Sequence, residues 1–176
     1  SIAILVRNRG HLEYIIRELH KSHISWESND IDRMGDLQVV RDLLSLTKAL
    51  LNPHDRLSWF SILRAPWLGL TTSDLHAVAQ FGENRSVWNT ISQSHEIPNL
   101  SQNGAERLAQ FVNNIAYSMR FRYQTSLREL VETTWNLLRG AAAIDTNREI
   151  ACVNLYFDLL TKQEYAGGLN SLEQFQ

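Results

Sequence analysis

From Asp36 onward, the apolar residues of this 176-residue chain recur with the spacing of an α-helix. The first such series runs Leu37, Val40, Leu43, Leu44, Thr47 and Leu51. Residues spaced in this way share one face of a helix and can be buried together. A chain dominated by this period builds a core by packing helix against helix, so we expect a mainly α fold.

Later segments repeat the helical pattern, with turn signals between them. They predict helices over residues 53–64, 71–79, 87–91, 105–123, 126–138 and 150–160. Three of the helix starts carry capping patterns: Asn52 with Pro53, Thr71 with Asp74, and Ser126 with Glu129. The all-α part is therefore expected to span residues 29–176.

The first 28 residues have a different pattern. Ile2 to Val6 is a continuous, β-branched apolar run, which predicts a strand buried on both faces. A helical stripe from Leu12 to Leu19 follows, and Ile24 to Glu27 is a second strand candidate. We therefore expect a short β-α-β piece over 1–28. Because the chain begins within a predicted strand and without methionine, we also expect it to be part of a longer protein.

Composition excludes several classes of protein. With 44% hydrophobic and 20% charged residues, the chain can bury a core and is not expected to be disordered. Its single cysteine, Cys152, excludes an internal disulfide and a cysteine-rich zinc site. No apolar run reaches the ~18 residues of a membrane helix, so we expect no membrane contact. A net charge of −2 confines any nucleic-acid contact to a local patch.

Common enzyme signatures are missing. The sequence has no G-x-x-x-x-G-K-[ST] phosphate loop, dinucleotide fingerprint, zinc-protease helix or nucleophile elbow. His20 and His23 fit a solvated helix end better than a metal site, and Asp30 and Asp32 fit a turn. Cys152 lies among apolar residues and fits a structural thiol. We expect neither a metal site nor catalytic residues within this chain.

Arg7 directly follows the first predicted strand. In open α/β sheets, ligands gather at the carboxyl ends of the strands, and a guanidinium there can hold a phosphate. A solvated arginine in a strand-to-helix turn is the simpler alternative.

A second candidate is the apolar turn from Pro66 to Asp74, which contains Gly69 and leads into a predicted helix. The free N–H groups of a helix start can bind phosphate, and Arg64 adds positive charge. Alternatively, the turn only fills the core and caps the helix. A weaker candidate is 119–123, where basic and aromatic residues alternate as in some single-strand binding surfaces. The simpler interpretation of that segment is an exposed helix end.

Several segments resemble UvrD/Rep-type superfamily I DNA helicases. Residues 2–9, followed by 12–19, are similar to motif IV of that family: an apolar strand, an arginine, a polar turn and a helix. Four further segments keep the family's order and spacing to about residue 76: 24–26, 40–46, 52–55 and 63–70. The sequence around residues 64–74 is more similar to the RecB and AddA types than to UvrD.

The resemblance implies that residues 1–28 are a remnant of the second RecA-like domain (2A), and that 29–176 form a 2B-like helical subdomain. The parent would be a bacterial, cytoplasmic, ATP-dependent DNA helicase or helicase–nuclease of the exonuclease V type, acting in recombination and repair. ATP and Mg²⁺ would be cofactors of the parent. The chain alone, without a phosphate loop, is expected to bind neither and to be inactive.

The resemblance also implies roles for particular residues. Arg7 would contact the γ-phosphate of ATP, and Gly69, Leu70 and Thr71 would contact duplex DNA. Arg64 and Thr72 complete the predicted DNA-binding set: Arg64, Gly69, Leu70, Thr71 and Thr72. Thr71 stands where the family has a second glycine, and Gly10 and His11 replace the family's usual motif IV turn residues.

The expected partners are duplex or junction DNA, bound weakly by the isolated chain, the remaining helicase domains and subunits of a nuclease complex. One alternative is a helical protein-interaction module that does not touch DNA. Another is an unrelated helical domain whose first strand mimics motif IV.

Overall fold

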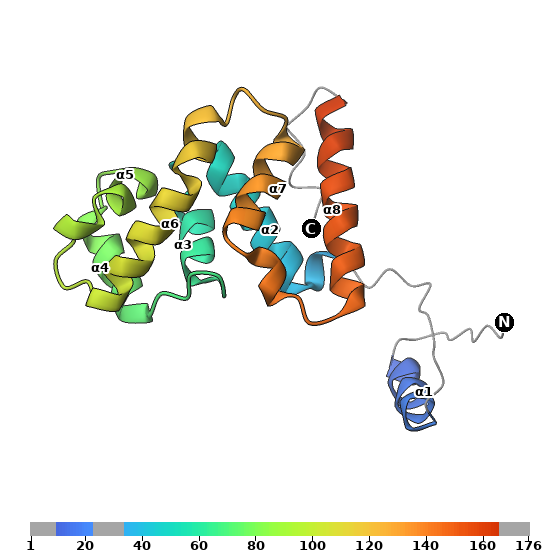
Figure 1. The fold of residues 1–176 in the computed structure, drawn as a ribbon. Coiled ribbons are helices and arrows are strands. Elements are labelled where there is room, and N and C mark those ends of the chain that lie inside the picture. The colour runs from blue at the N-terminus through green and yellow to red at the C-terminus, as the bar shows by residue number, and fades with distance from the viewer. Residues whose placement is uncertain (1–9, 23–33, 166–176) are drawn as a thin grey trace. The chain divides into compact units, whose positions relative to one another are not determined.

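All regular structure in the described part of the chain is helical. The computed structural model describes residues 10–22 and 34–165, and these contain eight α-helices and no strand (Figure 1). The prediction of a mainly α chain is confirmed. Both predicted strands, 2–6 and 24–27, lie outside the described residues, as does Arg7.

The chain divides into two units, Ser1–Asp32 and Arg33–Gln176. The first contains α1 (Gly10–Lys21), which confirms the helix predicted over 12–19. Tyr14 is exposed on α1, whereas Ile15 and Leu19 are half-buried, as expected for an amphipathic helix.

The second unit is a helical bundle. Its α-helices are α2 (Gln38–Leu51), α3 (Arg56–Arg64), α4 (Thr72–Phe81), α5 (Val87–Ser92), α6 (Gln102–Phe121), α7 (Leu127–Leu137) and α8 (Asn147–Tyr165). Short 3₁₀ turns cover Met34–Asp36, Ser94–Glu96 and Gly140–Ala143. Each helix predicted from residue 36 onward is present. However, α6 begins three residues before the predicted Ala105, because Ser101 caps it and accepts the Gly104 N–H.

The start of α3 differs from the prediction. Asn52 was expected to cap this helix, but Asp55 does so and accepts the N–H of Ser58 at 3.1 Å. Asn52 instead follows the end of α2, and its side chain accepts the His54 N–H at 3.0 Å. This local bond builds a turn around Pro53, so the next helix begins later.

The centre of the core is α2, which contacts α3, α7 and α8. Leu43, Leu46 and Leu50 are fully buried along it. Removing one such side chain from water stabilises the fold by roughly 1.5–3 kcal/mol. The stripe predicted from the sequence is confirmed in part: Val40, Leu43 and Thr47 are buried. Leu37, Leu44 and Leu51 are only partly buried, because the buried face is centred on Leu43, Leu46 and Leu50.

A buried pair of hydroxyls joins α2 to α8. The oxygens of Thr47 and Tyr156 lie 2.7 Å apart, and both side chains are fully buried. Thr47 also bonds to the carbonyl of Leu43 at 2.8 Å, which leaves Tyr156 to donate to Thr47. Burial raises the pKa of Tyr156, so this hydroxyl stays protonated.

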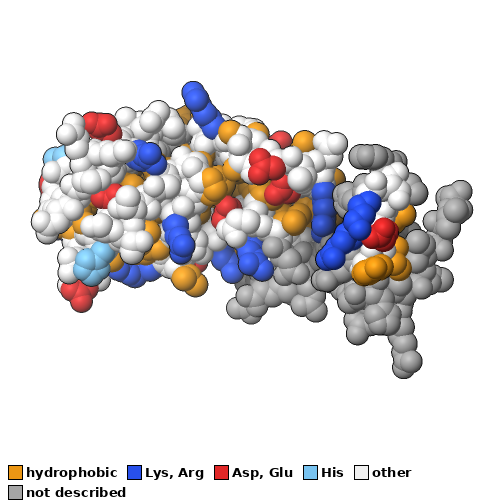
Figure 2. All heavy atoms as spheres, turned by 90° about the horizontal axis from the view of Figure 1, so that it is seen from below, with side chains coloured by type: hydrophobic (Ala, Val, Ile, Leu, Met, Phe, Trp, Pro, Cys, Tyr) orange, Lys and Arg blue, Asp and Glu red, His pale blue; other side chains and the backbone are white. Residues whose placement is uncertain are grey.

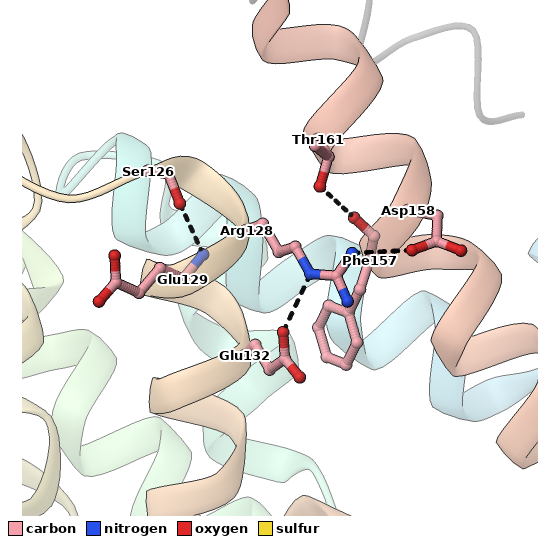
Figure 3. A network of polar contacts seen from close by, with 7 residues as sticks. All are labelled: Ser126, Arg128, Glu129, Glu132, Phe157, Asp158 and Thr161. Carbon is pink, nitrogen blue, oxygen red and sulfur yellow. Dashed lines mark hydrogen bonds and ion pairs between the residues drawn. The ribbon is translucent and has the colours of Figure 1, made fainter.

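A polar network joins α7 to α8 at the surface (Figure 3). Arg128 donates to Asp158 at 2.7 Å and to Glu132 at 3.1 Å. Ser126 caps α7 by accepting the Glu129 N–H, as its sequence pattern predicted. Because the Arg128 side chain is 38% exposed, we expect the network to orient the two helices more than to stabilise them.

Candidate nucleic-acid interface

The connection between α3 and α4 is a tight loop over residues 65–71. The N–H of Gly69 donates to Ala65 at 2.8 Å, and that of Leu70 donates back to Leu63 at 3.1 Å. Gly69 has φ +59°, a left-handed conformation that glycine adopts without strain. These bonds fold the loop back onto the end of α3.

The predicted DNA-binding residues have different environments. Arg64, Gly69, Thr71 and Thr72 are exposed, with Arg64 in the last turn of α3 and Thr72 at the start of α4. Leu70 is buried in the hydrophobic core, and its N–H is already bonded. The side chain of Leu70 therefore anchors the loop from inside.

Arg107 of α6 holds the loop from outside. Its Nη1 donates to the carbonyl of Leu68 at 2.9 Å and to that of Gly69 at 3.3 Å. Its Nε donates to Asn103 at 2.7 Å, which fixes the direction of the side chain. Sequence reasoning missed Arg107, because the bond to Leu68 spans 39 residues and leaves no local pattern.

A buried carboxylate lies where α4 and α6 begin. Asp74 accepts the Thr71 hydroxyl at 2.7 Å and the Ser101 N–H at 2.9 Å, while Thr71 accepts the Asp74 N–H at 3.1 Å. Burial opposes ionisation of Asp74, but the bonds from Thr71 and Ser101 outweigh it and lower the pKa of this carboxyl. Negative charge is favourable at helix N-termini, and here the chain supplies it itself.

Two donors at the start of α4 stay available. The N–H groups of Thr72 and Ser73 have no hydrogen-bond partner within 10–22 and 34–165. Arg64 has no ion pair or hydrogen bond in those ranges either. An incoming anion could therefore meet two N–H groups, with Asp74 limiting how much further negative charge can approach.

On the face of the larger unit seen in Figure 2, lysine and arginine side chains stand singly or in small groups and are interspersed with apolar and acidic ones. Such a face offers a few isolated phosphate contacts and no continuous basic groove.

The described residues offer no metal site and no candidate membrane span. None of their His, Cys, Asp and Glu side chains form a group of three that could hold a metal ion. No helix among them has both the length and the apolar character to cross a bilayer. Cys152 is half-buried and packs against the core, which agrees with a structural thiol.

The fold and the loop define an all-α domain with an exposed, glycine-containing turn fixed to a neighbouring helix. No protein-family model matches this chain, and no curated protein is similar to it at a significant level.

Proposed function

We propose that this chain is part of an ATP-dependent DNA helicase or helicase–nuclease of the UvrD/Rep type, acting in recombination and repair in the bacterial cytoplasm. Residues 29–176 would be the 2B-like subdomain, and 1–28 a β-α-β remnant of domain 2A. The observation that carries the proposal is the α3–α4 loop. It presents exposed Gly69 next to free helix N–H groups, in the segment whose sequence resembles the family's duplex-contacting loop.

The loop has the chemistry for a single phosphate contact. Gly69 supports this contact only by shaping the turn, because its N–H is bonded to Ala65 and Arg107 occupies the side where a Cβ would lie, so the donors must come from elsewhere for a phosphate. The N–H groups of Thr72 and Ser73 would donate to it, and Arg64 would add a permanent positive charge. Arg107 and the buried Leu70 keep the loop in one conformation, which lowers the entropy lost on binding.

Asp74 sets the strength of this contact. Its carboxylate partly neutralises the positive end of the α4 helix dipole and repels further phosphate groups. We therefore expect the isolated chain to bind duplex or junction DNA weakly.

In the parent protein, ATP and Mg²⁺ would be bound mainly by segments beyond this chain. Arg7 would contribute the contact to the γ-phosphate, and the other helicase domains and nuclease subunits would be the protein partners. Alone, the chain should not hydrolyse ATP. Phosphate release above the buffer background would contradict that expectation.

The alternative function is a helical protein-interaction module without DNA contact. The net charge of −2 favours it, and so does Thr71, which stands where the helicase family has a second glycine. In that case, substitutions at residues 64–73 would disturb assembly with partners and leave duplex binding unchanged.

Duplex binding tests the proposal. Fluorescence anisotropy with a labelled blunt-ended duplex should show weak binding with a log–log salt slope of about −1, as expected for one phosphate contact. Arg64→Ala should weaken it several-fold and reduce the log–log salt slope by about 1. Arg85→Ala is the matched control, since Arg85 bonds to Gln93 and stacks on Phe81, away from the loop. Equal affinities for the two variants would contradict a role for the loop.

A further inference from the structure

The C-terminal end of α6 carries a cluster that the proposed function does not use. It consists of two contacting groups that follow each other in the chain, and we call them together the aromatic–arginine patch: Tyr117 with Arg120 and Phe121, and Arg122 with Tyr123. The rings of Tyr117 and Phe121 lie 4.6 Å apart between centroids. The guanidinium of Arg120 lies 5.5 Å above the Phe121 ring, and that of Arg122 lies 4.6 Å above the Tyr123 ring. Each arginine is therefore already stacked on an aromatic ring.

Two of these rings face solvent. Tyr117 is 65% exposed and Tyr123 is 75% exposed, whereas Trp59 and Tyr156 in the same unit are fully buried. Neither exposed ring fills the core. Both leave ring surface free to stack against a planar group.

The segment that carries the patch, between Glu106 and Glu129, has charges of one sign. Residues 107–128 contain no Asp or Glu in a chain of net charge −2, and their basic residues are Arg107, Arg120, Arg122 and Arg128. The first and last of these hold the loop and the α7–α8 network. Arg122 donates to the carbonyl of Met119 and so closes the helix, while Arg120 has no hydrogen bond or ion pair in the described ranges.

We propose that the aromatic–arginine patch binds single-stranded nucleic acid. Unpaired bases would stack on Tyr117 and Tyr123, and the guanidinium of Arg120 would contact a neighbouring phosphate. In a duplex the bases are stacked on each other and their faces are unavailable, so the patch should prefer single strands. With one or two arginines, binding should be modest and only mildly salt-dependent.

The patch is separate from the α3–α4 loop. Arg107, which holds the loop, precedes Arg120 by 13 positions on the same helix. At 1.5 Å per residue, they are about 20 Å apart along the axis. The two surfaces can therefore be tested independently with variants of the same chain.

The test is fluorescence anisotropy with labelled oligo(dT), oligo(rU) and a blunt-ended duplex at low salt. The chain should bind a single strand. The polymer that it binds with the higher affinity, oligo(dT) or oligo(rU), identifies the preferred nucleic acid. Tyr117→Ala and Tyr123→Ala should each weaken that binding at least about five-fold. Tyr123→Trp should strengthen it, because indole offers a larger stacking surface.

Controls separate stacking from unfolding and from the loop. Tyr14→Ala removes another exposed tyrosine, from α1, and should change nothing. Arg64→Ala should leave single-strand binding intact, and the tyrosine variants should leave duplex binding intact. Helix content by circular dichroism should match the unmodified chain in every case. Absence of single-strand binding, or unchanged binding by folded Tyr117→Ala and Tyr123→Ala, would overturn the proposal.

Discussion

The N–H of Ser101 donates to the carboxylate of Asp74, 27 positions earlier in the chain, at 2.9 Å. This bond links the starts of two helices. α4 and α6 thus share one buried negative charge. The loop before α4 is held from the same helix, by Arg107. The position of the candidate interface therefore depends on α6.

Removing the Asp74 carboxylate should destabilise the fold. Asp74→Ala leaves the Ser101 N–H and the Thr71 hydroxyl without their acceptor, at a cost of about 2 kcal/mol. Urea denaturation measures this loss. A change within the error of the measurement would show that the network does not stabilise the domain.

The same carboxylate predicts a pH dependence. Because the pKa of Asp74 is lowered in the folded state, the unfolded chain binds more protons as pH falls below the ordinary value of 3.8. The stabilisation is present above that value and is lost as pH falls through the folded pKa. The free energies of unfolding of the unmodified chain and of Asp74→Asn should therefore approach each other in acid. A difference that stays equal at all pH values would contradict the lowered pKa of Asp74.

Gly104 is required by its packing against Asp74. A Cβ at Gly104 would lie 2.8 Å from the carboxylate carbon, which its hydrogen bonds hold in place. Gly104→Ala should therefore cost roughly 1–3 kcal/mol, although alanine favours helix. In an Asp74→Ala background the substitution should be neutral or stabilising. A double-mutant cycle by denaturation checks this coupling.

Gly69 should be sensitive to the shape of the side chain introduced. At φ +59°, a β-branched residue is strongly disfavoured, whereas asparagine adopts this conformation more readily. A Cβ would also lie 3.3 Å from Nη1 of Arg107. Gly69→Val should cost more than about 1 kcal/mol and Gly69→Asn clearly less. Equal costs would show that the loop can change its turn.

The Thr47–Tyr156 pair should show strong coupling. Tyr156→Phe removes one partner but leaves Thr47 bonded to Leu43, so we expect a loss of about 1 kcal/mol. Thr47→Val takes away the 2.7 Å partner of the buried Tyr156 hydroxyl, and the loss should be larger, about 2 kcal/mol. The double variant should lose less than the sum, as measured by thermal or urea unfolding.

The local parts of the fold could be predicted from sequence. The α2 stripe and the caps at Thr71 and Ser126 depend on residues within a few positions of each other. The prediction that Asn52 caps α3 was wrong, and the reason is also local. The Asn52 side chain bonds within the turn around Pro53, and the same sequence pattern fits such a turn and a helix cap.

The contacts that shape the candidate site could not be predicted in this way. Arg107 reaches the loop from 39 residues away, and Asp74 meets Ser101 across 27. Each side chain has an ordinary local explanation, as a surface arginine and as a capping-box acid. Only the packing of α4 against the start of α6 gives them their further role.

The central claim is that the α3–α4 loop contacts duplex DNA, and a titration followed by amide NMR tests it most directly. Adding a blunt-ended duplex to the ¹⁵N-labelled chain should shift the amides of Gly69, Thr72 and Ser73, and of few residues elsewhere in 34–165. Arg64→Ala should reduce those shifts at equal DNA concentration. Shifts confined to other surfaces would contradict duplex contact by the loop. So would the absence of any shift with duplex from a chain whose patch still binds oligo(dT).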